Sequence, residues 1–126
     1  MSNFGKAEAT WKPKYRGFTT KSVYLTMHDG VKLAVDIQLP KGLASDAKIP
    51  SLILQTRYWR ANDVRPPFKW FQKQSEAIEV FTCGGYALVF VDVRGTGASC
   101  GVWPYPWSSD EVKDEGEIVD WIIKQP

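Results

Sequence analysis

One serine of this 126-residue chain stands in a motif that could perform covalent chemistry. Residues 97–101 read G-A-S-C-G, which matches the G-x-S-x-G string of a serine hydrolase nucleophile elbow. In such an elbow the strand ends within a couple of residues of the serine, and a helix starts directly after it. Ser99 instead lies seven residues past Asp92, and Pro104 and Pro106 prevent a helix from following at once. We therefore expect the Ser99 hydroxyl to bond nearby backbone groups and stabilise a turn, rather than to act as a nucleophile.

The chain offers no evident base for such a serine. Its only histidine, His28, precedes Asp29-Gly30, a dipeptide typical of a hairpin turn. We expect His28 to be a solvated turn residue. A phosphate-binding loop is also disfavoured, because Cys100 stands where the third glycine of G-x-G-x-x-G would be and no helix N-terminus follows.

Apolar periodicity predicts the strands that must position this turn. Residues 23–27 and 31–39 alternate between apolar and polar side chains, which predicts a β-hairpin. Residues 51–56 read S-L-I-L-Q-T and residues 87–91 read A-L-V-F-V. Such short continuous apolar runs are typical of strands buried in a mostly parallel sheet.

Two helices are expected between and after these strands. The first opens at Pro66-Pro67, carries Phe68, Phe71, Ile78 and Phe81 at helical spacing, and stops at Gly84-Gly85. The second begins with a capping box, Ser108 followed three residues later by Glu111. The order hairpin, strand, helix, strand, helix predicts an α/β fold with an antiparallel edge. The apolar stripe of the second helix is expected to comprise Val112, Ile118, Val119 and Ile122.

Charge and composition exclude several classes of protein. The formal net charge is only +2, which is too small to indicate nucleic acid or anionic lipid as a partner. The acidic residues gathered between positions 110 and 120 are interpreted as a solvated face, as are the basic ones near the start. No secretory signal and no membrane-spanning run is present, so we expect a cytoplasmic protein without membrane contact. Cys83 and Cys100 lack the spacing of a zinc or redox site, so we expect reduced thiols, no metal and no cofactor.

Residues 1–21 form a separate unit in this interpretation. They lack periodicity and mix aromatic with basic side chains, which suggests an arm draped over a domain that comprises residues 22–126. Such a mixture could also bind single-stranded nucleic acid. No RNP-type motif accompanies it, so we expect no nucleic-acid partner.

Five short motifs follow one another along the domain. They read M-H-D-G-V-K-L at 27–33, Q-T-R-Y at 55–58, G-Y-A at 85–87, D-V-R-G-T-G-A-S at 92–99 and W-I-I-K-Q at 121–125. In this order they resemble the CocE/NonD family of α/β-hydrolases, which includes bacterial cocaine esterase, α-amino acid ester hydrolases and X-Pro dipeptidyl peptidases. The resemblance implies a partial α/β-hydrolase core, an N-terminal β-hairpin and then β-α-β-α, truncated before the nucleophile strand.

The same resemblance assigns few catalytic residues to this chain. In the family the acylated serine lies in G-x-S-Y-x-G, one strand beyond the Trp-x-x-x-Gln helix end, and the triad Asp and His follow later. None of the three can be assigned here. Tyr58 matches the family tyrosine whose phenol helps to form the oxyanion hole, although Arg57 stands where many members have proline. Asp92 and Arg94 are expected to tie their turn to neighbouring groups.

Two functions from different classes fit these observations. The chain would be the N-terminal segment of a serine hydrolase that cleaves a small-molecule ester or peptide through an acyl-enzyme, inactive alone because the triad is absent. Alternatively, it is a non-catalytic truncated or split-gene fragment that pairs with a separate chain. In the family's strand order the missing strand would pair beside residues 51–56, which should leave that strand as an exposed edge open to self-association.

Overall fold

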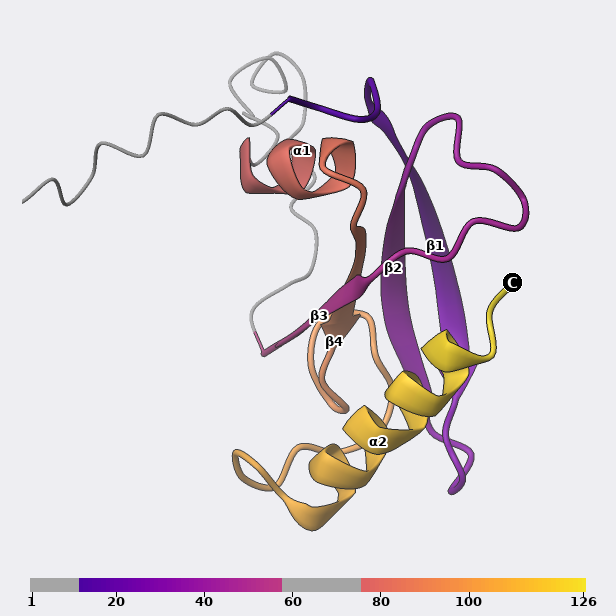
Figure 1. Ribbon diagram of the computed structural model, residues 1–126. Coiled ribbons are helices and arrows are strands. Elements are labelled where there is room, and N and C mark those ends of the chain that lie inside the picture. The colour runs from indigo at the N-terminus through magenta and orange to yellow at the C-terminus, as the bar shows by residue number, and fades with distance from the viewer. Residues whose placement is uncertain (1–11, 58–75) are drawn as a thin grey trace, which may run out of the picture.

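The computed structural model describes residues 12–57 and 76–126 (Figure 1). The expected helix start at Pro66-Pro67 lies outside these ranges, as does Tyr58. In chain order the described residues form β1 (Phe18–Thr26), β2 (Lys32–Pro40), β3 (Ser51–Thr56), α1 (Glu76–Cys83), β4 (Ala87–Asp92) and α2 (Ser109–Ile123).

The four strands form one mixed sheet in the order β1-β2-β4-β3. β1 and β2 pair as an antiparallel hairpin, with Phe18 opposite Pro40 and Thr26 opposite Lys32. β4 runs antiparallel to β2 and parallel to β3. This topology confirms the α/β fold with an antiparallel edge, although β1 begins at Phe18, five residues before the expected strand.

The core lies between this sheet and α2, which crosses one of its faces in Figure 1. Alternate residues of β2 and β4 point to that face because side chains alternate along a strand. Ile118 of α2 packs against them and is fully buried. Burying one such aliphatic side chain contributes about 1.5–3 kcal/mol. The buried apolar cluster comprises Met27, Leu33, Val35, Val89, Val91 and Ile118.

The buried face of α2 differs from the predicted stripe. Ile118 and Ile122 do pack on the sheet, but Val112 is 56% exposed and Val119 is also exposed. Asp114 and Glu111 occupy the positions one and two turns before Ile118, respectively, and both carboxylates are buried. The sequence-based stripe was wrong there because it assigned buried positions to apolar residues only.

The start of α2 and the end of α1 both lie where the sequence predicts them. Ser108 caps α2, with its Oγ accepting a hydrogen bond of 3.3 Å from the N–H of Glu111. α1 ends where predicted, and Gly85 adopts φ 99°, a left-handed conformation that glycine takes without strain.

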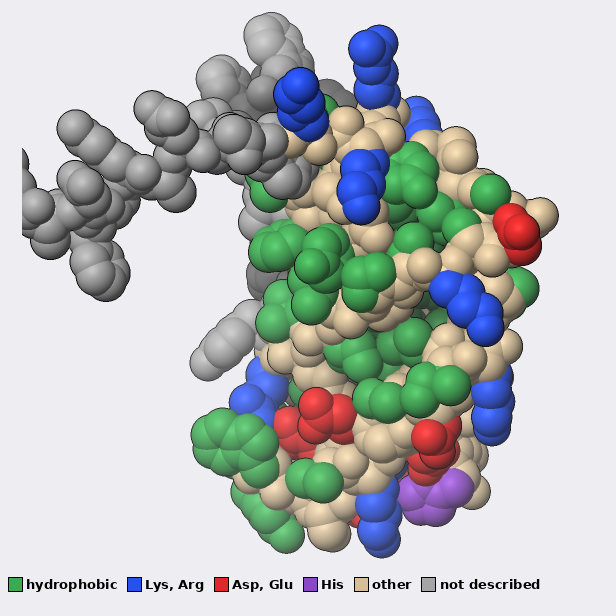
Figure 2. Space-filling model, viewed as in Figure 1, with side chains coloured by type: hydrophobic (Ala, Val, Ile, Leu, Met, Phe, Trp, Pro, Cys, Tyr) green, Lys and Arg blue, Asp and Glu red, His purple; other side chains and the backbone are tan. Residues whose placement is uncertain are grey.

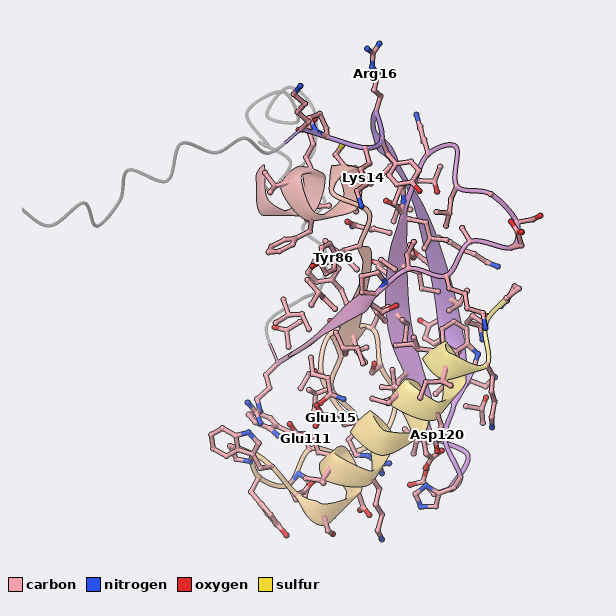
Figure 3. All side chains as sticks on the ribbon, in the orientation of Figure 1. Lys14, Arg16, Tyr86, Glu111, Glu115 and Asp120 are labelled. Carbon is pink, nitrogen blue, oxygen red and sulfur yellow. The ribbon has the colours of Figure 1, made fainter. Side chains whose placement is uncertain are left out.

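The described part of the N-terminal arm contacts the end of α1. The backbone N–H groups of Lys14 and Tyr15 both donate to the Cys83 carbonyl, at 2.8 and 3.1 Å. Figure 3 shows Lys14 close to α1, at the end of the sheet opposite the first turns of α2. Within the described ranges, no helix is both long enough and apolar enough to pass through a bilayer.

Candidate functional site

The Ser99 hydroxyl is engaged entirely with backbone groups. Its Oγ donates to the carbonyl oxygen of Asp92 at 2.6 Å and accepts from the N–H of Ala34 at 2.8 Å. These bonds join the turn after β4 to the first residues of β2. The prediction of a turn-stabilising hydroxyl is confirmed.

Glycine is required in the same turn for steric reasons. Asp92 is buried, and its Oδ2 accepts a hydrogen bond of 3.0 Å from the N–H of Ala98. Gly97 adopts φ 54°, and a Cβ added there would collide with the Asp92 carboxylate. The carboxylate therefore occupies the space that any other side chain at position 97 would need.

Arg94 joins this turn to α2 and to the β1–β2 hairpin. Its Nε and Nη2 donate to the two oxygens of Asp114 at 2.7 and 2.6 Å, and its Nη1 donates to Asp29 at 2.8 Å. We call these three residues the Arg94 cluster. The Asp114 carboxylate raises the pKa of Arg94, and the hydrogen bond from Arg94 lowers the pKa of Asp29. The expected structural role of Arg94 is thereby confirmed.

The acidic segment at positions 110–120 is not a uniformly solvated face. Asp114 is 1% exposed and Glu111 is 5% exposed, and each pairs with an arginine. The solvated-face interpretation was wrong for these two carboxylates, because partners from other parts of the chain compensate their burial.

His28 is also more than a solvated turn residue. Its backbone N–H donates to Glu117 at 2.9 Å, and its ring Nδ1 pairs with the other oxygen of the same carboxylate. The imidazole remains half exposed. The earlier expectation missed this pair because Glu117 lies 89 residues further along the chain.

A second arginine lies directly after β3. Nη2 of Arg57 donates to Oε1 of Glu111 at 2.7 Å. Its guanidinium carbon lies 4.8 Å from the ring centroid of Trp107 and 5.6 Å from that of Trp103, within the range of a cation–π contact. We call these four residues the Arg57 clamp. Figure 3 shows Glu111 and Glu115 on the side of α2 that faces the end of β3.

A small hollow of about 240 Å³ lies beside the Arg57 clamp. Arg57, Trp107 and Glu111 contribute to its wall, together with Gln55 of β3. In open α/β sheets ligands bind outside the carboxyl ends of the strands, which is where Arg57 stands. Sequence reasoning noted Arg57 only as a departure from proline and missed both tryptophans. No local signal pointed to this contact, because Trp103 and Trp107 lie 46 and 50 residues after Arg57 in the sequence.

The remaining candidate residues are Tyr58, the two cysteines and any group of metal ligands. Tyr58 follows Arg57 in the sequence but lies outside the described residues, so its role in an oxyanion hole stays a prediction. Cys83 is buried and Cys100 is exposed, and both are free thiols as expected. Across residues 12–57 and 76–126, no group of three His, Cys, Asp or Glu side chains is arranged to hold a metal ion.

The mixed sheet, its helices and the turn after β4 define a partial α/β-hydrolase fold, as predicted. Residues 29–126 match the family described as X-Pro dipeptidyl-peptidase (S15 family). This chain belongs to that family, and the resemblance inferred from the five motifs is confirmed.

Individual relatives agree with this assignment. A protein of Mycobacterium bovis named as a serine esterase is 42% identical over an alignment of 144 residues, which covers 100% of this chain and 23% of the relative. Cocaine esterase of a Rhodococcus species is 35% identical over 82% of this chain and 16% of its own length. The structure of a CocE/NonD family hydrolase from Staphylococcus aureus matches with a TM-score of 0.67 at 25% identity, over 86% of this chain and 21% of that one. The chain therefore spans less than a quarter of the length of these relatives.

Proposed function

We propose that this chain is the N-terminal segment of a serine hydrolase that cleaves esters or amides, of the acyl ester or X-Pro peptide type, through an acyl-enzyme. The family match over residues 29–126 carries the proposal. Relatives named as a serine esterase and as cocaine esterase support ester cleavage in particular. The substrate would be a small-molecule ester or a peptide that the complete enzyme binds.

In this proposal Tyr58 is an oxyanion donor. Its phenol would donate a hydrogen bond to the negative oxygen of the tetrahedral intermediate, and the backbone N–H after the catalytic serine would supply the second donor. Removal of one such preorganised donor typically costs about 3–4 kcal/mol of transition-state stabilisation. Support comes from the position of Tyr58 in the sequence, one residue past Arg57 and two past the last residue of β3.

We propose further that the segment is inactive alone. A serine nucleophile needs a base that accepts its proton. The Ser99 hydroxyl instead donates to the Asp92 carbonyl, and the ring of His28 pairs with Glu117. The serine, aspartate and histidine of the triad would be supplied by residues outside this sequence.

The test is expression of the complete coding sequence that contains this chain, with assays on p-nitrophenyl acetate and an X-Pro p-nitroanilide. We expect hydrolysis, and labelling by a fluorophosphonate of one serine outside residues 1–126. Tyr58→Phe should lower kcat by roughly 100- to 1,000-fold with little change in KM. Ser99→Ala should leave kcat unchanged. Labelling of Ser99, or the absence of both hydrolysis and a labelled serine, would overturn the proposal.

The second candidate is a non-catalytic fragment that pairs with another chain. It is favoured by β3, which is an edge of the described sheet and exposes Leu52 and Leu54. An apolar hollow of about 630 Å³ also opens between α2 and the sheet, on the face where Figure 2 shows hydrophobic side chains gathered. Unpaired edges and exposed apolar surface are both sites of association.

Sedimentation of the isolated 126-residue chain tests this second candidate. We expect self-association that Leu54→Lys weakens, because a charge on an edge strand opposes pairing. Asp120→Asn, an exposed substitution on α2 that also raises the net charge by one unit, serves as a control for the change in charge alone. A monomeric, cooperatively folded chain would exclude the pairing fragment.

A cytoplasmic location forms part of the same proposal. The thiols of Cys83 and Cys100 are both free, and the cytosol keeps thiols reduced. Fractionation of cells that produce the complete protein should recover it with cytosolic markers. Recovery from the secreted or membrane fraction would contradict this location.

A further inference from the structure

Trp107 exposes a large aromatic ring beside the hollow at the carboxyl end of β3. The residue is 75% exposed, although tryptophan is highly buried on average in folded proteins. It lines the hollow of about 240 Å³ together with Val112, which is 56% exposed. Figure 2 shows hydrophobic side chains next to acidic ones over the first turns of α2. The hollow therefore offers apolar surface to a ligand.

The backbone of Trp107 is held in an uncommon conformation. Its φ is 57°, which costs energy for a residue with a Cβ and persists only where surrounding contacts impose it. Oε2 of Glu111 accepts a hydrogen bond of 2.9 Å from the N–H of Trp107, and the guanidinium carbon of Arg57 lies 4.8 Å from the ring centroid. Such strain is concentrated at active sites and ligand clamps. The ring is thus fixed in place while it remains exposed.

The charged groups of the hollow disfavour an ionic ligand. Arg57 already stacks on the ring and donates to Glu111 at 2.7 Å, so a second cation at the same ring would be repelled. An anion would meet the carboxylates of Glu111 and Glu115. Glu115 is exposed to water, where an ion pair with a ligand contributes little. An uncharged planar group avoids these costs and gains contact with the Trp107 ring.

We propose that the hollow beside the Arg57 clamp binds an uncharged aromatic group, with the Trp107 ring as the surface on which that group stacks. Ligands of open α/β sheets bind outside the carboxyl ends of the strands, where Gln55 and Arg57 contribute to this hollow. Stacked rings attract each other beyond the effect of buried area alone. As a subsite for the aromatic part of an ester or amide substrate, the hollow rests on the proposed hydrolase function, whereas the binding itself does not.

Binding is tested on the complete protein labelled with 5-fluorotryptophan. The fluorine resonance of Trp107 is the one that Trp107→Phe removes. Benzyl alcohol should shift this resonance with a Kd roughly 3- to 10-fold lower than that of cyclohexylmethanol, which lacks the aromatic ring. Benzylamine and benzoate, a cation and an anion at pH 7, should bind more weakly than benzyl alcohol. An unshifted resonance, or tightest binding of a charged analogue, would overturn the inference.

A matched variant controls for the aromatic character of the loop. Tyr105 is 59% exposed in the same loop but is not among the described residues that line the hollow. Tyr105→Ala should leave the Kd of benzyl alcohol unchanged. An equal loss of affinity in Tyr105→Ala and Trp107→Phe would place the binding outside the hollow and contradict the proposal.

Hydrolysis by the complete enzyme then tests the substrate subsite. Ethyl benzoate and benzyl acetate each carry an aromatic group on one side of the ester, and ethyl acetate carries none. Trp107→Gly removes the ring and relieves the positive φ. It should raise KM for at least one aromatic ester by roughly 3- to 10-fold and change KM for ethyl acetate less than about twofold. Where this variant does not fold, Trp107→Asn takes its place, because asparagine also tolerates a positive φ.

The outcomes separate the subsite from the proposed function. An equal change of KM for all three esters would indicate a structural role of Trp107 and overturn the subsite. If the wild-type enzyme hydrolyses none of the esters and none of the substrates named above, the hydrolase proposal fails, and the fluorine titration still decides whether the hollow binds an aromatic group.

Discussion

Two arginines connect strand ends to the same helix, and they do so differently. The Arg94 side chain is 6% exposed and directs three hydrogen bonds at two carboxylates, those of Asp114 and Asp29. Arg57 is 22% exposed, shares one carboxylate, Glu111, and is otherwise covered by aromatic rings. Its buried Nε has no hydrogen-bond partner among the described residues.

This difference separates a structural cluster from a candidate site. A buried arginine that donates three hydrogen bonds to carboxylates fixes the fold, because its removal leaves the buried charge of Asp114 uncompensated. The Arg57 clamp is less completely satisfied and borders a hollow at the carboxyl end of β3. We therefore expect changes in the Arg94 cluster to lower stability more than changes in the Arg57 clamp.

The largest expected effect comes from Arg94→Met. It leaves the Asp114 carboxylate buried without a partner, so the free energy of unfolding should fall by about 3–5 kcal/mol. Arg57→Met is the matched variant and should cost less, about 1–3 kcal/mol, because the buried Glu111 carboxylate keeps its hydrogen bond from the N–H of Trp107. Urea denaturation of both proteins, monitored by tryptophan fluorescence, gives the two losses in the free energy of unfolding. Equal losses would remove the distinction between the two arginines.

Gly97→Ala should be the next most damaging change. A Cβ at φ 54° is strained and collides with the Asp92 carboxylate, so we expect a loss of about 2–4 kcal/mol. Gly116→Ala is the control, since a Cβ on this helical glycine meets nothing within 4 Å. It should stabilise the protein by up to about 1 kcal/mol. Relative to wild type, the melting temperature should therefore fall for Gly97→Ala and rise for Gly116→Ala.

Ser99→Ala is expected to have a moderate effect. It leaves the N–H of Ala34 and the carbonyl of Asp92 without their partner, at a cost of about 1–3 kcal/mol. The kcat per active site should stay at the wild-type value. A fall in kcat per titrated active site would instead indicate that Ser99 takes part in catalysis.

The smallest effect concerns the pH dependence of stability. Arg94 lowers the pKa of Asp29 in the folded protein, so its carboxylate stabilises the fold above the unfolded pKa of about 4. This contribution is lost as the pH falls through the lower folded pKa. The stability difference between wild type and Asp29→Asn, measured by urea denaturation from pH 6 to pH 2, should therefore shrink towards the acid end. The shrinkage should be smaller when Arg94 is replaced by Met, because Arg94 is the largest but not the sole group that lowers the pKa of Asp29.

Local signals predicted much of this fold. The bounds of β3 follow directly from one apolar run, and the start of α2 follows from Ser108 and its spacing to Glu111. Asp29-Gly30 marked the hairpin correctly, with Gly30 at φ 83°. These features depend on backbone conformations and hydrogen bonds between residues close in sequence, so a short stretch contains the required information.

The wrong predictions of burial and of side-chain partners share one cause, which is pairing between residues distant in the sequence. Glu111 and Asp114 were assigned to solvent, and Val112 to the core, because a helical pattern was read from apolar residues alone. The arginines that allow the two carboxylates to be buried lie 54 and 20 residues away. His28 was misjudged in the same way, since its partner Glu117 comes from α2.

The sequence by itself determined the family, the order of the elements and the turn-stabilising role of Ser99. Each of these rests on local motifs, whose geometry is set by backbone sterics and short-range hydrogen bonds. Only the tertiary structure decided which charges are buried, how Arg94 locks the turn and how two tryptophans enclose Arg57. Burial of a charge depends on whether an opposite charge reaches it from elsewhere in the chain, and that is a property of the folded molecule.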